Sequence, residues 1–241
     1  MRALLFSLLF LCASAGAWEP PHTVKIVVPT GGAGTITSIA YAARNALVDA
    51  GVDGIVVARP GAEGAVAAEA IATAPRDGCT IGLFGNLYSD THPSVFPLVK
   101  VATYQYMEVF SLNPQKGAER FVAVSAGGSF RAAVMARGRG EKVDFVSYKS
   151  AYAAFVDVAA GRVGRFYPSL LTATELLRSG KLNPGRVGWP ESVYLVVPTG
   201  VSAEVRAYYT AVFSGPSTES LRAAISSAYA TPVLEAINAA R

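Results

Sequence analysis

The sequence has few of the side chains that most often carry catalysis or hold metal ions. It contains two histidines and two cysteines in 241 residues. His22 lies close to the N-terminus, and His92 belongs to THPSVFP, a stretch typical of a surface turn. No G-x-S-x-G elbow, paired-histidine metal motif or Cys-x-x-Cys motif occurs. We therefore expect no catalytic residues, no metal site and no cofactor.

Long apolar runs are absent too, except at the start of the chain. Residues 1–17 read MRALLFSLLFLCASAGA: one arginine, an apolar run, and small residues ending in Ala15-Gly16-Ala17. This pattern predicts a secretory signal peptide, too short to span a bilayer, that is cleaved before Trp18. We therefore expect a soluble protein exported to the periplasm.

Cysteine and charge are scarce in the exported part. Cleavage removes Cys12, so only Cys79 remains and no internal disulfide can form. It also removes one of the 21 basic residues and none of the 17 acidic ones, so the net charge falls from +4 to +3. This small excess argues against nucleic-acid binding and leaves room for an anionic ligand. We expect a monomer.

What the chain does contain is an alternation of strand-like and helix-like segments. Val24–Val28 is β-branched, and Ile36, Ile39, Ala40, Ala43 and Leu47 then recur at helical spacing. The alternation continues to the C-terminus and predicts an α/β fold with parallel sheets and helices on both faces. Polar stretches at Asn113–Glu119 and Asn183–Glu191 are predicted crossings between two lobes with a ligand cleft between them.

A glycine-rich stretch lies between the first predicted strand and helix. VVPTGGAG allows a tight turn, after which the free N–H groups of the helix N-terminus face the end of the sheet. Thr37 stands where a dinucleotide fingerprint has its third glycine, and the Gly-Lys-Ser/Thr of a P-loop is missing. An anion site and a plain turn both fit this stretch alone.

A second stretch of the same kind favours the anion site. Ser125-Ala126-Gly127-Gly128-Ser129 follows the strand-like FVAV and opens another predicted helix. If the lobes face each other, both loops can hold a carboxylate through N–H groups, assisted by hydroxyl groups. Those hydroxyls belong to Thr35, Thr37, Ser125 and Ser129.

These residues also carry a family resemblance. The order of IVVP-GG, RPGAEGAVAAEAIATAPRDGCTIGLFGN, HPSVFP, SYKSAYAAFVDVAAGRV and ELLRSGKL resembles the Bug family, the extracytoplasmic receptors of tripartite tricarboxylate transporters. The resemblance implies a type II periplasmic-binding-protein fold: residues 18–112 and 192–241 in one lobe, and 113–191 in the other. It also implies capture of a small carboxylate in the cleft and delivery to a membrane permease.

By position, the family's ligand loops fall on Thr30–Thr37, Gly85–Tyr88 and Ser125–Ser129. The predicted ligand-binding residues are Gly31, Gly32, Ala33, Gly34, Thr35, Thr37, Gly85, Asn86, Ser125, Gly127, Gly128 and Ser129.

Two other functions remain open at this point. One is a degenerate receptor that acts as a sensory or protein-binding partner. The other is a small hydrolase that uses Cys79, with His92 as its base, although a cysteine that opens an apolar strand is usually inert.

The first prediction concerns export. N-terminal sequencing of the protein recovered from the periplasm should begin at or near Trp18, because the small residues at 15–17 form the cleavage site. A cytoplasmic product that retains Met1 would contradict it.

Overall fold

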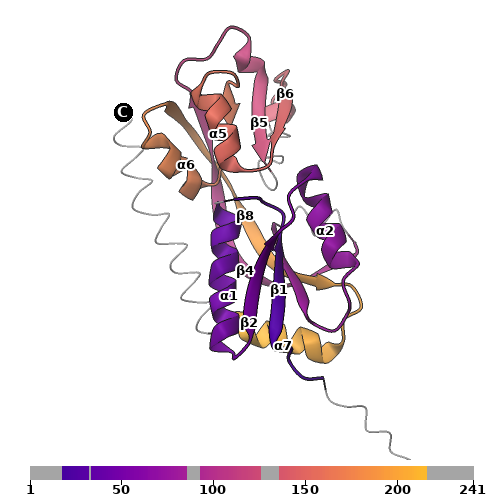
Figure 1. The fold of residues 1–241 in the computed structure, drawn as a ribbon. Coiled ribbons are helices and arrows are strands. Elements are labelled where there is room, and N and C mark those ends of the chain that lie inside the picture. The colour runs from indigo at the N-terminus through magenta and orange to yellow at the C-terminus, as the bar shows by residue number, and fades with distance from the viewer. Residues whose placement is uncertain (1–17, 33, 86–92, 126–135, 216–241) are drawn as a thin grey trace, which may run out of the picture.

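The chain folds into two α/β lobes connected by a pair of long strands (Figure 1). A computed structural model describes residues 18–32, 34–85, 93–125 and 136–215. Their eight strands form one continuous hydrogen-bonded order, β2-β1-β3-β8-β4-β7-β5-β6. The strands β2, β1 and β3 at one end form the sheet of the first lobe, and β7, β5 and β6 at the other end form that of the second. The strands β8 and β4 lie between the two groups.

The first lobe has a parallel sheet with helices on both faces. Its strands are β1 (Thr23–Val28), β2 (Asp53–Ala58) and β3 (Thr80–Gly85). One face packs on α1 (Thr35–Asp49) and α7 (Ala203–Ser214), and the other on α2 (Ala65–Ala72). A 3-10 turn, η1 (Ala62–Gly64), precedes α2. The residues of α1 whose spacing predicted a helix are its buried face.

The second lobe repeats this scheme on a smaller scale. Its parallel strands are β5 (Phe121–Ser125), β6 (Asp144–Tyr148) and β7 (Arg165–Phe166), and η2 (Ala118–Arg120) leads into β5. The helices α5 (Ala151–Ala159) and α6 (Leu170–Leu177) cover one face and enclose a core around Phe166. Val122, Val124, Val143 and Tyr167 pack on the other face.

The two connecting strands correct the prediction of purely parallel sheets. β4 (Val95–Ser111) and β8 (Leu182–Pro198) pair antiparallel along almost their whole length, and β8 also pairs antiparallel with β3. β4 contributes Val101 to the first core and Val109 to the second. The strand itself therefore makes the crossing, and Asn113–Glu119 follows it at the far end of the second lobe. The proposed division of the chain between the lobes stays a prediction.

Serine side chains fix the start of three helices. Ser150, Ser169 and Ser202 precede α5, α6 and α7, and each hydroxyl accepts a hydrogen bond from the backbone N–H three residues later. Such N-caps satisfy a donor that the first helical turn leaves open. Helix α1 differs, because it begins after Gly34 and has no side-chain cap.

Within the described part of the chain, no helix combines the length and apolar character needed to cross a membrane. The predicted signal peptide and the helix expected after Ser129 up to residue 135 lie outside the described residues.

The second prediction concerns the packing of Gly161 at the end of α5. Gly161 has φ +74°, and a Cβ there would lie 2.2 Å from the carbonyl oxygen of Asn113. Gly161→Ala should therefore lower the free energy of unfolding by more than the roughly 1 kcal/mol expected from backbone strain alone. Urea unfolding measures the change.

Gly117→Ala is the matched control. Gly117 has a similar φ of +85° but no atom within 4 Å of an added Cβ. Equal losses in the two variants would mean that the close approach of Asn113 contributes nothing.

Candidate functional site

A cavity lies where the two lobes meet, between the ends of the first-lobe and second-lobe elements. It has a volume of about 50 Å³. The first lobe contributes Thr30, Gly31, Gly34, Thr35 and Ile36, and β4 contributes Tyr104 and Tyr106. The second lobe contributes Ser125, Ser150, Ala151, Tyr167, Pro168, Ser169 and Thr172. None of these described lining residues carries a formal charge.

Three helix N-termini converge on this cavity. Helices α1, α5 and α6 begin at Thr35, Ala151 and Leu170, and each starts within or next to the cavity wall. None of the three has an acidic residue in its first turn. Unpaired N–H groups and the positive ends of the helix dipoles therefore make the cavity electropositive without any cationic side chain.

The three N-termini are not equally available to a ligand. Ser150 and Ser169 already accept from the N–H groups of Ala153 and Thr172. Helix α1 has no such side-chain acceptor at Gly34. Its first N–H groups are therefore the best placed to donate to a bound anion.

Two direct contacts close the lobes over the cavity. The hydroxyl of Thr35 in the first lobe hydrogen-bonds the hydroxyl of Ser169 in the second. On the same side, the N–H of Gly31 donates to the carbonyl oxygen of Lys149 at 3.3 Å. Both contacts must break before the lobes can separate.

The tyrosines form the wall nearest the connecting strands. The hydroxyl oxygens of Tyr104 and Tyr106 lie 2.6 Å apart, and their rings meet edge to face with centroids 5.2 Å apart. Their hydroxyls supply polar groups to a wall that is otherwise aromatic.

The structure brings together only some of the predicted ligand-binding residues. Gly31, Gly34, Thr35 and Ser125 line the one cavity. Gly32 and Thr37 are not among the lining residues. The Thr37 hydroxyl donates to the Gly32 carbonyl within the loop. Gly32 has φ +75°, which favours glycine. That the four lining residues bind a ligand stays a prediction.

Other predicted residues lie elsewhere or outside the described residues. Gly85 packs against Glu191, a fully buried side chain of β8 whose carboxylate oxygen occupies the space an added Cβ would need. Gly85 is not a lining residue. Ala33, Asn86, Gly127, Gly128 and Ser129 are outside the described residues.

Sequence reasoning missed the second-lobe helix starts. Ser150, Ser169 and Thr172 were not predicted as site residues, although Ser150 and Ser169 each stand directly before a helical pattern. A serine at that position is a recognised N-cap signal and could have located both helix ends.

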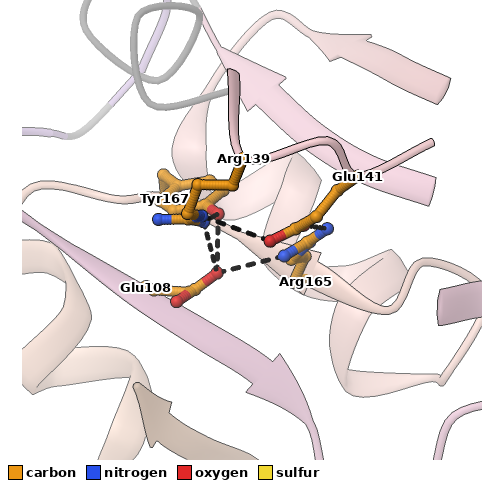
Figure 2. A network of polar contacts seen from close by, with 5 residues as sticks. All are labelled: Glu108, Arg139, Glu141, Arg165 and Tyr167. Carbon is orange, nitrogen blue, oxygen red and sulfur yellow. Dashed lines mark hydrogen bonds and ion pairs between the residues drawn. The ribbon is translucent and has the colours of Figure 1, made fainter. Parts of the chain in front are cut away.

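A buried ionic network supports the cavity wall from behind (Figure 2). It joins Glu108, Arg139, Glu141, Arg165 and Tyr167. The Tyr167 hydroxyl donates to Glu108 Oε1 at 2.6 Å, and Arg165 Nη1 donates to the same oxygen at 3.3 Å. Burial and the bond to Glu108 raise the pKa of Tyr167 to about 12, so its hydroxyl stays a donor. The network therefore fixes a ring that lines the cavity.

Glu141 holds the two arginines of the network together. Partial burial alone would raise the pKa of its carboxyl. The hydrogen bonds and charges of Arg165 and Arg139 outweigh burial, so the pKa lies below its ordinary range. Among the described residues, no group of three or more His, Cys, Asp or Glu side chains is arranged to hold a metal ion.

Comparison with known proteins bears on the fold. No protein-family model and no curated sequence matches the chain. Among solved structures, MatC from Rhodopseudomonas palustris with bound malate is 16% identical, with a TM-score of 0.71 over 84% of this chain and 88% of that one. The periplasmic binding protein BugD is 17% identical, with a TM-score of 0.72 over 84% of this chain and 86% of that one.

These likenesses settle the architecture. The chain has the fold of a periplasmic solute-binding protein. The predicted structural resemblance to Bug-type receptors is thereby confirmed. The VFT2 domain of Bordetella pertussis BvgS has the same fold, with 16% identity and a TM-score of 0.63 over 86% of this chain and 93% of that one.

The third prediction uses pH to test the network. Glu141→Gln should lower the free energy of unfolding at pH 7 by about 1 kcal/mol, near the upper end for a partly exposed ion pair. Because the folded-state pKa is lowered, the stabilising contribution is present above the ordinary pKa and is lost as the pH falls through the folded value. The difference between wild type and variant should therefore shrink below about pH 4.

Glu69→Gln serves as the control, since Glu69 is exposed on α2. Glu69→Gln should leave the free energy of unfolding nearly unchanged at pH 7 and at pH 3. A Glu141→Gln loss that is equally large at pH 7 and pH 3 would mean that ionisation of Glu141 contributes nothing.

Proposed function

We propose that this protein is a periplasmic solute-binding protein of the Bug family that captures a small carboxylate in its interlobe cavity. The observation that carries the proposal is the convergence of three helix N-termini, free of acidic first-turn residues, on one cavity. Helix N-termini bind carboxylates and phosphates through N–H groups and the helix dipole. The fold shared with malate-bound MatC supports this assignment.

The ligand enters by separation of the lobes. The cavity of about 50 Å³ is bridged by direct contacts between the two lobes. The Thr35–Ser169 and Gly31–Lys149 contacts therefore open to admit the solute, and the lobes then close on both of its ends.

The proposed role requires no covalent chemistry. The protein binds its carboxylate reversibly and delivers it to the permease of a tripartite tricarboxylate-type transporter. Charge complementarity comes from main-chain groups, so the binding site needs no lysine or arginine.

The hydrolase reading finds little support. Cys79 is not among the cavity residues, and its backbone N–H donates to Asp77 Oδ1 at 2.8 Å. Burial and the neighbouring Asp77 raise the pKa of the Cys79 thiol, which disfavours the reactive thiolate. His92, its predicted base, lies outside the described residues.

One observation favours a second candidate, the sensory partner. The lobes already touch through Thr35 and Ser169 beside the cavity, and the fold is also that of a BvgS domain. A protein in this role would keep its lobes closed without ligand and would present its outer surface to a partner.

The fourth prediction tests the carboxylate site at Gly34, where α1 begins. An added Cβ at Gly34 meets nothing within 4 Å, and its extended φ of 161° suits any residue. Gly34→Val should therefore fold normally but fill the cavity, and should weaken carboxylate binding by about tenfold or more, the equivalent of one charge-assisted hydrogen bond. After circular dichroism confirms that the variant is folded, calorimetry with malate, succinate and citrate measures the affinity of wild type and variant for each carboxylate.

Gly138→Val is the control, because Gly138 has similarly open surroundings and is not a cavity residue. It should bind like wild type. If wild type binds none of these carboxylates, and X-ray scattering shows the same radius of gyration with and without malate, the receptor proposal fails and the sensory candidate gains.

A further inference from the structure

A second cavity lies behind the tyrosine wall of the interlobe cavity. It has a volume of about 200 Å³. Its apolar surface comes from Tyr106, Tyr167 and Val187, and the first two also line the interlobe cavity. The two cavities are therefore neighbours that share these two side chains.

Two arginine side chains at the second cavity have guanidinium N–H groups that are not fully used by other described residues. Arg186, on β8, is exposed, and within the described ranges its side chain has no ion-pair or hydrogen-bond partner. Arg139 keeps 44% of its side chain exposed, and its Nη2 makes only long contacts, 3.4 Å to the Tyr167 hydroxyl and 3.9 Å to Glu108 Oε1. Both guanidinium groups therefore have donors available to a ligand.

The acidic groups near this cavity are already occupied. Glu108 is the one acidic side chain among the described residues that line it, and its Oε1 accepts from Tyr167 and Arg165. Glu141 bonds both Arg139 and Arg165. With three arginines against two glutamates, the local charge is +1, which favours an anion.

We propose that this second cavity binds a small organic anion with an apolar body, such as an aromatic or medium-chain monocarboxylate. Its carboxylate pairs with Arg186 and with Arg139. Arg139 belongs to the ionic network of Figure 2. Its apolar part packs against Tyr106, Tyr167 and Val187. A volume of 200 Å³ equals about six waters at roughly 30 Å³ each, enough for one ring with its carboxylate.

This combination is characteristic of ligand pockets. Most small-molecule sites have apolar walls and a few convergent polar groups that fix the orientation of the ligand. The interlobe cavity has the opposite character, with many N–H and hydroxyl groups and no charged side chain among its described lining residues. The two sites therefore select different anions.

The experiment is a titration of the isotopically labelled protein with benzoate, and separately with hexanoate, followed by backbone amide shifts. Val187 and Gly188 report on the second cavity alone, and Gly34 and Ser150 on the interlobe cavity alone. We expect saturable shifts at Val187 and Gly188. Benzamide, the neutral isostere of benzoate, should bind at least several-fold more weakly.

Two variants test the two halves of the site. Arg186→Ala should weaken benzoate binding by about tenfold, as for loss of a charge-assisted hydrogen bond. Gly188→Val should abolish it by filling the cavity. A Cβ at Gly188 comes no closer than 3.5 Å to the Tyr106 carbonyl, so this variant should fold.

Arg178→Ala is the charge-matched control, since Arg178 is exposed at the end of α6 and is not a lining residue. It should leave benzoate affinity unchanged. The proposal is overturned if neither probe shifts Val187 and Gly188, if shifts appear only at Gly34 and Ser150, or if Arg186→Ala and Gly188→Val bind like wild type. Equal binding of benzamide would overturn the anionic character of the site.

Discussion

The antiparallel pairing of β4 with β8 is the constraint on which both lobes depend. Each strand runs out of one hydrophobic core and into the other, so neither lobe has a complete sheet without them. Their ladder is interrupted where the lobes meet, with register shifts between Gln105 and Met107 and between Met107 and Val109. Such irregularities break the ladder locally and increase the twist.

The interlobe cavity follows from this arrangement. Strands β1, β6 and β7 are followed by α1, α5 and α6, and all three helices begin at the interlobe cavity. A site made of helix ends from two bodies exists only when the bodies are correctly apposed. A direct hydrogen bond between Thr35 of the first lobe and Ser169 of the second joins the two lobes at this point.

The helices of the two lobes are visible in the sequence pattern, and the two long strands that connect the lobes are not. Segments such as Ile36–Leu47 have one buried face and show it as helical spacing, because burial of that face is what stabilises the helix. β4 and β8 show no such regularity. They contain Pro97, Pro184 and Pro190, which usually exclude a central strand. Here Pro97 lies beside a register shift, and Pro184 pairs with Val109 beside another, where the ladder is already interrupted.

The site was predictable where its signal is local. Glycines after a β-branched strand located the start of α1, and the fold brought Gly31, Gly34 and Thr35 to the cavity. Ser125 was placed by the same reasoning. Tyr104, Tyr106 and Tyr167 could not be placed, because their position depends on the crossing strands and on the short β7, which only tertiary pairing defines.

Among the described residues, no charged side chain lines the interlobe cavity, whereas a group of charges lies close to it in the second lobe. Glu108 and Arg165 are nearly buried in the second lobe, where desolvation opposes them, and each is compensated by an opposite charge and a hydrogen bond. The same network holds Tyr167 with its ring toward the cavity and its hydroxyl toward Glu108. Ionic interactions thus orient one wall residue of a cavity whose described lining carries no charge. A site of this kind draws its electropositive character from helix dipoles that do not titrate, so its attraction for a carboxylate persists as long as the solute itself stays ionised.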